Sequence, residues 1–328
     1  MSSPSRSVLI LGGTGFIGWH ACGRFLRRGY RATVVGLPPL PQQGLFPAEV
    51  NVVLADLNAL ADAEVTRLLQ GHDAVIFAAG ADDRVTPRRP AWSFFRAANV
   101  LAAQRLFTLA RQAGVKRGVL LGSYFVHFAR TRPELELARH HPYIRSRLEQ
   151  EQACLDATLP DLALTILELP YIFGTMPGRV PLWRPLIRYI RATPVLFYTR
   201  GGTNMTSVEH VAEAIVGAVE QGRAGERYLI GDENLTWVEF LNRLSRVLGR
   251  RKRVITLPNW AILLAFAGVK LLHWLQGREG GLDPAHLLEL QAINTFFDPE
   301  PSRRALGFGS GGLDQAFAET VEACRVSR

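Results

Sequence analysis

The chain has 328 residues, of which 48% are hydrophobic and 20% charged, which is typical of a globular protein and excludes a disordered one. Its net charge is +9, but the basic residues are scattered and no basic–aromatic motif accompanies them, so nucleic acid is not an expected partner. Cys22, Cys154 and Cys324 are far apart, and the start of the chain does not resemble a signal peptide, so we expect a cytoplasmic protein with reduced thiols and no metal.

The first apolar run, from Ser7 to Leu11, predicts a buried strand that ends in closely spaced glycines and continues as a helix. Gly12 can adopt the positive φ of a tight turn, Gly15 leaves room for phosphates, and Gly18 lets the helix pack close to the strand. The helix would present the positive end of its dipole to this turn. With a second strand at 31–35, the pattern predicts a βαβ unit that holds a dinucleotide.

Strand and helix patterns then alternate through the first half of the chain. The expected strands are 50–54, 73–77, 119–121 and 162–167, and the expected helices are 60–69, 91–113 and 143–157. Continuous apolar strands between helices predict an α/β fold of the Rossmann type, a doubly wound parallel sheet with helices on both faces. Ligands of such a sheet bind beyond the carboxyl ends of the strands.

After residue 170 the order becomes irregular, because prolines at 170, 177, 181, 185 and 194 interrupt it. We expect a helix at 208–220, a strand at 227–230 and a helix at 236–248 with Thr236 as its N-cap. The predicted organisation is a dinucleotide-binding core at 1–170 and a mainly substrate-binding portion at 171–328, with elements at about 203–232 returning to the core.

The segment 257–275 predicts a helix that is apolar nearly all round, although Lys270 and His273 interrupt it. It is too short and too charged for a transmembrane span. Three interpretations stay open: a lid over an apolar pocket, a buried or dimer-forming helix, and a peripheral contact with an anionic membrane. The third would draw on Arg250, Arg251, Lys252 and Arg253.

Several motifs occur together in a characteristic order. They are Gly12-Gly13-Thr14-Gly15-Phe16-Ile17-Gly18, Ala55-Asp56-Leu57, Phe77-Ala78-Ala79-Gly80, Asn99-Val100, Leu121-Gly122-Ser123, Tyr143 with a basic residue downstream, and Thr206-Ser207-Val208. By these motifs the chain resembles the extended short-chain dehydrogenase/reductase family, the NAD-dependent epimerase/dehydratase group, over nearly its whole length. The resemblance implies a nicotinamide cofactor bound by Gly12, Thr14, Gly15, Phe16, Ile17, Gly36, Asp56, Leu57, Ala78, Ala79, Gly80, Asn99, Tyr143, Arg147 and Pro170.

The resemblance also implies roles for single residues. Asp56 would accept a hydrogen bond from the adenine amino group, and Asn99 would support the active site from the middle of a helix, where Asn is otherwise unfavourable. Two simpler interpretations stay open. Asp56 could cap the next helix, and Asn99 could be a tolerated polar residue.

Gly36 stands at the end of the second strand, where members that prefer NAD carry a carboxylate that repels a 2′-phosphate. Its absence slightly favours NADP(H) over NAD(H). Because no arginine directly follows, Arg31 or a more distant arginine would have to bind the phosphate.

Catalysis would involve Ser123, Tyr143 and Arg147. A phenol with a pKa of about 10 needs a neighbouring cation before it takes part in proton transfer at neutral pH. The family places Lys four positions after Tyr, one helical turn away, whereas this chain has Arg147 there. Either Arg147 still binds the ribose and lowers the Tyr143 pKa, or the catalytic pair has decayed. His127, His140 and His141 lie in an expected loop between Ser123 and Tyr143, from which they could reach the site.

The substrate is predicted from a departure after the sixth strand. Sugar-nucleotide members carry an Arg-Pro pair and then Asn, whereas this chain reads Glu168-Leu169-Pro170-Tyr171-Ile172-Phe173-Gly174. That difference favours the dihydroflavonol-reductase and 3β-hydroxysteroid-dehydrogenase-like branch, with an apolar ketone or secondary alcohol as substrate. A sugar-nucleotide epimerase or dehydratase and a non-catalytic NAD(P)-binding sensor or assembly protein are the alternatives. The family also implies a homodimer through the helices at 91–113 and 143–157.

Overall fold

Seven parallel strands form the central sheet, in the order β10-β6-β5-β4-β1-β2-β3. The computed structural model describes residues 6–326. The strands are β1 (Ser7–Leu11), β2 (Arg31–Gly36), β3 (Asn51–Leu54), β4 (Ala74–Phe77), β5 (Arg117–Ser123), β6 (Ala163–Leu169) and β10 (Arg227–Leu229). This arrangement confirms the predicted Rossmann-type fold.

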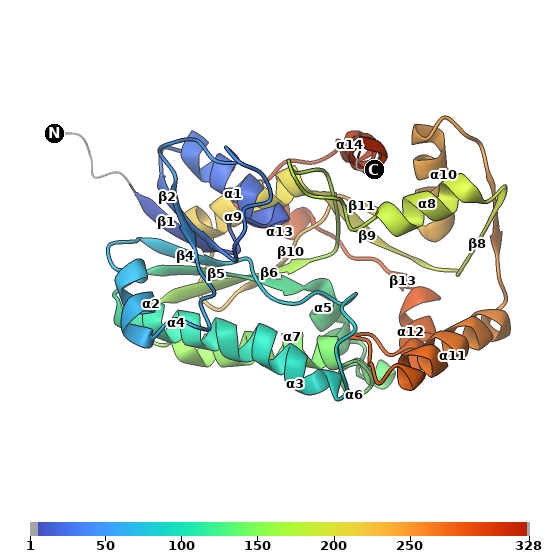
Figure 1. The fold of residues 1–328 in the computed structure, drawn as a ribbon, viewed down its shortest axis with the longest axis horizontal. Helices are drawn as coiled ribbons and strands as arrows, with labels where there is room; N and C mark the ends of the chain where they lie inside the picture. The colour runs from blue at the N-terminus through green and yellow to red at the C-terminus, as the bar shows by residue number, and fades with distance from the viewer. Residues whose placement is uncertain (1–5, 327–328) are drawn as a thin grey trace.

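Helices cover both faces of this sheet (Figure 1). One face carries α1 (Phe16–Arg27), α9 (Val208–Gln221) and α13 (Glu300–Leu306), and the other carries α2 (Asp62–Leu69), α4 (Ala102–Gln112) and α7 (Pro142–Thr158). Successive side chains of a strand point to opposite faces, so Val8 and Ile10 join one apolar cluster while Leu9 and Leu11 join the other. Since both faces are buried, the strands read as continuous apolar runs.

The helix predicted at 91–113 has a break in its regular winding. It consists of α3 (Ala91–Phe95), a π-helical segment (Arg96–Leu101) and α4. A π-helical turn holds an extra residue, which frees backbone groups from the regular ladder. Within this segment, the carbonyl of Asn99 accepts a hydrogen bond from Gln150 Nε2 at 2.8 Å.

The segment between Ser123 and Tyr143 is helical, so the predicted loop is wrong. It contains α5 (Tyr124–Thr131), a 3₁₀ turn (Pro133–Leu135) and α6 (Leu137–His140). Tyr124, Phe125 and Phe128 are buried on one side of α5, and this packing stabilises a helix too short to be stable alone. Ser123 is the N-cap of α5.

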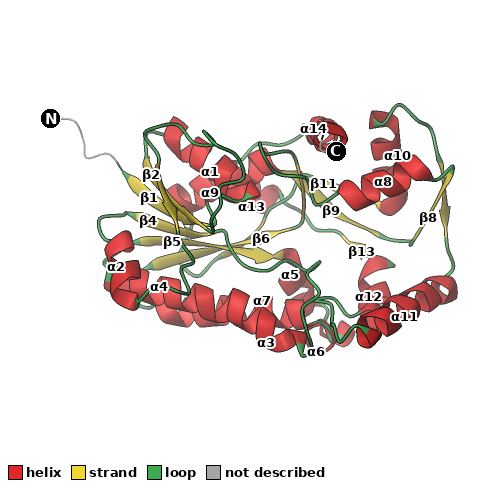
Figure 2. Ribbon diagram, in the orientation of Figure 1, coloured by secondary structure: helices red, strands yellow, loops and turns green. Residues whose placement is uncertain are grey.

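The C-terminal portion faces the carboxyl ends of the central strands, with helices and two sheets of its own, one of four strands and one of two (Figure 2). Its strands are β7 (Tyr171–Phe173), β8 (Val195–Tyr198), β9 (Gly202–Ser207), β11 (Glu233–Thr236), β12 (Arg253–Thr256) and β13 (Asn294–Thr295), and its helices are α8 (Arg184–Ala192), α10 (Trp237–Val247), α11 (Asn259–Leu275), α12 (Pro284–Gln291) and α14 (Leu313–Val326). Thr236 caps α10 through a capping box with Glu239, as its sequence predicts. Of the elements expected to return to the core, α9 packs on α1 and β10 pairs with β6, whereas β9 belongs to the four-stranded sheet of the C-terminal portion.

Candidate active site

The glycine turn after β1 is fixed by close approaches of the backbone. Gly12 has a φ of +81°, and a Cβ there would overlap the carbonyl of Ala78 at the end of β4. A Cβ at Gly18 would overlap the carbonyl of Gly12. Gly12 and Gly18 are therefore required by the fold of the turn itself.

The amino end of α1 opens at this turn. A Cβ at Gly15, the N-cap of α1, would lie 3.0 Å from Gly12 O and 3.2 Å from Arg179 Nη1. Phe16 and Ile17 begin the helix, whose first N–H groups have no partners within a helix. Helix N–H groups, a positive dipole end and a guanidinium fit the pyrophosphate of a dinucleotide.

Gly36 is also required by contact, because a Cβ there would overlap the hydroxyl of Thr14. No carboxylate can stand at this position without moving Thr14. Arg31, in contrast, pairs with Ser7 at the amino end of the sheet, away from the glycine turn. The expectation that Arg31 could bind a phosphate of the cofactor is therefore wrong.

Asn99 connects the end of β4 with α7. Its Oδ1 accepts the Ala81 N–H at 2.8 Å, and its Nδ2 donates to Ser146 Oγ at 3.0 Å. The side chain is fully buried, so the interpretation of a merely tolerated polar residue does not fit. Gly80, with a φ of +114°, brings the chain from Ala78 and Ala79 past this amide.

Asp56 lies exposed beyond the carboxyl end of β3. Its Oδ1 accepts the N–H of Asn58 at 3.0 Å, which closes a local turn, whereas α2 begins at Asp62 with Ala61 as its N-cap. Asp56 therefore does not cap the next helix. Of the other predicted cofactor residues, Leu57 is buried beside Asp56, and Pro170 lies between β6 and β7.

Tyr143 and Arg147 lie one turn apart on α7, both buried, with 6% and 7% of their surfaces exposed. The guanidinium carbon of Arg147 is 5.2 Å from the centre of the Tyr143 ring. Arg147 donates to Gln150 Oε1 at 2.9 Å and to the carbonyls of Ala81 and Leu121 at 3.3 and 3.4 Å. Gln150, which sequence reasoning missed, therefore holds both Arg147 and the Asn99 carbonyl.

Ser123 is two residues beyond Leu121 at the carboxyl end of β5, and its Oγ accepts the Phe125 N–H at 3.4 Å. The next residue, Tyr124, accepts a hydrogen bond from Thr203 at 2.9 Å. Burial raises the pKa of Tyr124, and the nearby groups of Asp83 and Tyr143 raise it further. Tyr124 of α5 and Tyr143 of α7 therefore lie in one cluster, and Ser123 directly precedes Tyr124 in the chain.

Asp83 and Arg179 are two further charged residues that sequence reasoning missed. Burial raises the pKa of the Asp83 carboxyl, while the charges of Arg84 and Arg147 partly offset this effect. The only available signals were weak, since Asp83 follows the Ala78-Ala79-Gly80 motif and Arg179 follows a Pro-Gly pair. Neither pattern is specific.

Glu168, at the position that departs from the sugar-nucleotide pattern, points into an internal ion network. Arg130 binds Glu168 and also Glu151, which it contacts at 2.8 Å, and Arg227 contacts Glu151 at 2.8 Å from the other side. Burial raises the pKa of Glu168 to about 8, with a further contribution from Glu151. Its carboxyl therefore supports the fold beneath the site.

The three histidines between Ser123 and Tyr143 lie on helices or at a helix cap. His141 is fully buried, accepts the Asp283 N–H at 2.9 Å, and burial lowers its pKa to about 4. His140 stacks on His286 with ring centres 3.5 Å apart, whereas His127 lies on α5. Two of them therefore hold the start of α12 against α7.

Known proteins resemble this chain over most of its length. A putative dihydroflavonol 4-reductase from Synechocystis is 25% identical, covering 95% of this chain and 92% of the relative. The human sterol-4-alpha-carboxylate 3-dehydrogenase (decarboxylating) is 26% identical, covering 99% of this chain and 90% of the relative. These names agree with the branch that the sequence motifs favour.

Solved structures share the fold. The structure of gox2253 matches with a TM-score of 0.78 and 22% identity, covering 98% of both chains. That of MoeE5 in complex with UDP-glucuronic acid and NAD matches with a TM-score of 0.68 and 22% identity, covering 98% of this chain and all of the other. Residues 8–231 match the NAD dependent epimerase/dehydratase family, so the predicted relationship is confirmed. The chain is a member of the NAD-dependent epimerase/dehydratase family.

Proposed function

We propose that this protein is an NAD(P)-dependent oxidoreductase that transfers hydride between a nicotinamide cofactor and an apolar ketone or secondary alcohol. The observation that carries this proposal is the buried Tyr143–Arg147 pair, in which a network of hydrogen bonds holds the Arg147 guanidinium in place. Ala81, Leu121 and Gln150 hold Arg147, and Asn99 holds Gln150 in turn. A guanidinium placed this firmly beside a phenol ring suits a catalytic pair better than a decayed one.

A bound nicotinamide supplies or accepts the hydride. In the direction of reduction, the Tyr143 hydroxyl donates its proton to the substrate oxygen, and in oxidation the tyrosinate accepts it back. Arg147, whose guanidinium carbon lies 5.2 Å from the centre of the Tyr143 ring, places a positive charge beside the residue that transfers the proton. Ser123 donates a hydrogen bond to the same oxygen and so orients the carbonyl.

We infer that NADP(H) is preferred over NAD(H), because Thr14 excludes a carboxylate at Gly36. Arg179 replaces Arg31 as the candidate phosphate ligand. Its neighbour Gly178 approaches Pro41, in the loop after β2, so closely that a Cβ would lie 2.5 Å from the Pro41 carbonyl. Arg179 thus stands between the loop after β2, where a 2′-phosphate would lie, and Gly15, where the pyrophosphate would lie.

An apolar substrate is favoured by the surroundings of Tyr143. Its ring packs edge-on against Phe95, with centres 5.9 Å apart, and belongs to an aromatic cluster with Tyr124, Phe125 and Phe297. Glu168 is engaged with Arg130, and it supplies no positive charge of the kind that a sugar nucleotide diphosphate would need.

The test is oxidation of NADPH or NADH by the purified chain, followed by absorbance, with a panel of aliphatic, aromatic and sterol ketones. We expect turnover with NADPH, and Tyr143→Phe should lower kcat about 1,000-fold with a much smaller effect on cofactor affinity. Turnover of UDP-sugars alone would favour the epimerase alternative. Tight NADPH binding with no turnover of either panel would contradict the enzyme proposal and favour a sensor.

A further inference from the structure

The helix α11 presents an apolar face to solvent. Trp260, Leu264 and Leu275 are 66%, 66% and 67% exposed. The residues of this face recur every three or four positions, which places them on one side of a helix: Trp260, Leu263, Leu264, Ala267, Leu271, Trp274 and Leu275. Of the seventeen residues of α11, all of them described, Ile262 alone is buried. The interpretation of 257–275 as a buried helix is therefore wrong, whereas its interpretation as a lid over an apolar pocket stays a prediction.

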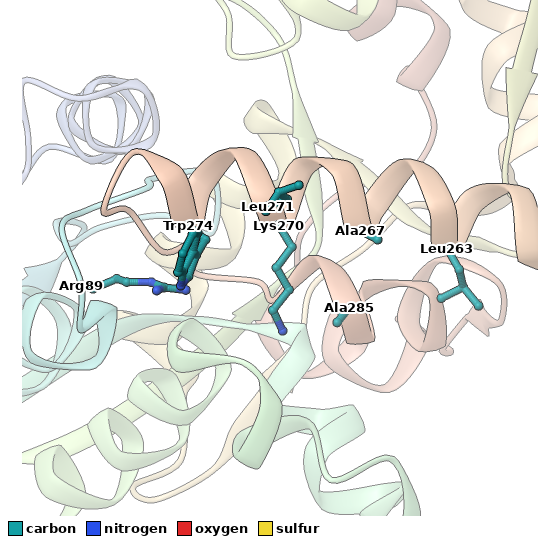
Figure 3. Close-up of a pocket in the computed structure, with 7 residues that line it drawn as sticks. All are labelled: Arg89, Leu263, Ala267, Lys270, Leu271, Trp274 and Ala285. Carbon is teal, nitrogen blue, oxygen red and sulfur yellow. The ribbon is translucent and has the colours of Figure 1, made fainter.

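A groove runs along the edge of this face. Figure 3 shows Leu263, Ala267, Leu271 and Trp274 of α11 beside Arg89 and Ala285, in a groove of about 480 Å³. Its lining is mostly apolar, and Lys270 at its edge forms an ion pair with Asp283 at 3.0 Å. Among residues 6–326, the structure has no helix that is both long and apolar enough to span a membrane.

Positive charge gathers at the carboxyl end of α11. Arg88 pairs with Arg278 in an isolated β-bridge, and the N–H of Arg89 donates to the Gly277 carbonyl at 3.1 Å, so these residues form one exposed cluster, Arg88–Arg89–Arg278. The nearby carboxylates are engaged, because Glu279 accepts the Ala91 N–H at 2.7 Å and Asp283 pairs with Lys270. Arg278 also donates to the Thr86 carbonyl at 3.3 Å, but within residues 6–326 none of the three guanidinium groups forms an ion pair, so their charges can meet anionic groups.

The basic residues that the sequence suggested for this contact have another role. Arg250 donates to the Arg191 carbonyl at 3.1 Å, and Lys252 donates to the Thr193 carbonyl. These carbonyls lie at the end of α8, where cations satisfy free acceptors. Arg253 is the first residue of β12 and the other three precede it, so all four stand at the end of β12 that is away from α11. The expected help from Arg250, Arg251, Lys252 and Arg253 stays a prediction, and the docking surface does not rely on it.

We propose that α11 and the Arg88–Arg89–Arg278 cluster dock the protein on an anionic membrane surface, with the helix lying in the plane of the interface. Leucines on the outward face enter the acyl boundary, Trp260 and Trp274 sit at the headgroup level near its two ends, and the arginines contact lipid phosphates. Docking on a second copy is disfavoured, because it would bring two cationic clusters of a chain with a net charge of +9 together.

Docking also gives a route to the site. The loop after α11 reaches the amino end of α7, where the Gly281 carbonyl accepts the Tyr143 N–H at 2.9 Å. An apolar substrate dissolved in the bilayer would enter beside this loop. This consequence depends on the proposed oxidoreductase function, whereas the docking itself does not.

The test is co-sedimentation of the full chain with vesicles of phosphatidylglycerol and phosphatidylcholine in equal parts, compared with phosphatidylcholine alone. We expect binding to the anionic vesicles that weakens as salt rises, with a blue shift of tryptophan fluorescence. Leu264→Glu with Leu271→Glu should weaken binding at least about tenfold, and so should Arg89→Glu with Arg278→Glu. Tyr143→Phe should bind vesicles as the wild type does, which separates docking from catalysis.

The controls change equally exposed residues elsewhere. Leu159→Glu, just before the amino edge of β6, and Arg251→Glu, across β12, should leave binding unchanged. Equal thermal unfolding of all variants excludes misfolding as the cause. Absence of binding to anionic vesicles, or binding that the α11 variants do not change, overturns the proposal. Self-association that Leu264→Glu abolishes, without vesicle binding, would assign the face to a second copy.

Discussion

The glycine turn and the Asn99–Arg147 cluster both belong to the proposed cofactor site, but different interactions hold them. In the turn, Gly12 and Gly18 are required because backbone atoms lie where a Cβ would be. In the cluster, hydrogen bonds link buried polar groups: Arg147 donates to Gln150, Gln150 donates to the Asn99 carbonyl, and the Asn99 amide donates to Ser146. A steric requirement can be recognised in the sequence, because only glycine meets it. A polar network cannot be recognised in this way, because no single residue type identifies it.

The first prediction tests the steric requirement for glycine in the turn after β1. Gly18→Val places carbon atoms against the Gly12 carbonyl, so the turn must shift away from its present geometry. We expect the affinity for NADPH to fall about 1,000-fold, because the backbone N–H groups that face the phosphates would move with the turn. Fluorescence titration with NADPH measures this loss.

The same helix provides the control. A Cβ at Gly23 of α1 would meet no atom within 4 Å in the described structure. Gly23→Ala should therefore keep the affinity and stabilise the protein by up to about 1 kcal/mol, because alanine favours a helix. Equal losses of affinity in both variants would contradict the steric account.

The second prediction uses acid on a buried polar residue outside the cluster, His141, the N-cap of the helix that carries Arg147. Burial lowers the pKa of His141 to about 4, below its value near 6.5 in an unfolded chain. The unfolded state therefore binds more protons in this window, and stability present above pH about 6.5 is lost as pH falls toward 4. We expect a loss of about 3 kcal/mol in the free energy of urea unfolding.

His141→Asn is the matched variant for this prediction. Its side-chain oxygen can still accept the Asp283 N–H, but it does not titrate. The slope of stability against pH between these values should become shallower in this variant. An unchanged slope would show that other groups cause the acid sensitivity.

The third prediction breaks the network at Asn99. Asn99→Ala leaves the Ala81 N–H and the Ser146 hydroxyl without their present partner, and it opens a small cavity. The free energy of unfolding should fall by about 2 kcal/mol. Asn51→Ala, at an exposed position, is the control and should change it by less than about 0.5 kcal/mol. Similar losses of unfolding free energy in the Asn99 and Asn51 variants would contradict a special role of the network in stability.

The sequence predicted the sheet and the turn because their signals are local. Apolar runs identified β1, β4 and β6, and the spacing of Gly12, Gly15 and Gly18 identified the turn. The contact of Gln150 with Asn99 and that of Arg179 with Gly15 were not predicted, because they join residues far apart in the chain. The π-helical segment around Asn99 was not predicted for another reason, because one extra residue hardly changes the apolar pattern of a long helix.

α5 and α11 illustrate two further limits. The segment containing α5 was predicted as a loop because short helices depend on tertiary packing, here of Phe125 and Phe128. The apolar pattern of α11 predicted a helix, but an apolar pattern alone does not tell a buried face from an exposed one.

The last and smallest prediction concerns Arg147, the charged residue of the polar cluster. Arg147→Lys restores the family's residue, but a lysine has one ammonium in place of the fork that contacts Gln150 and the carbonyls of Ala81 and Leu121. We expect kcat/KM to fall about tenfold, because the ammonium cannot keep all three contacts while it lies beside Tyr143. Steady-state kinetics with NADPH and the best ketone of the panel measures it, and Arg145→Lys, on the same helix, is the control. A gain in turnover would instead mean that arginine impairs the site, and it would support the view of a decayed catalytic pair.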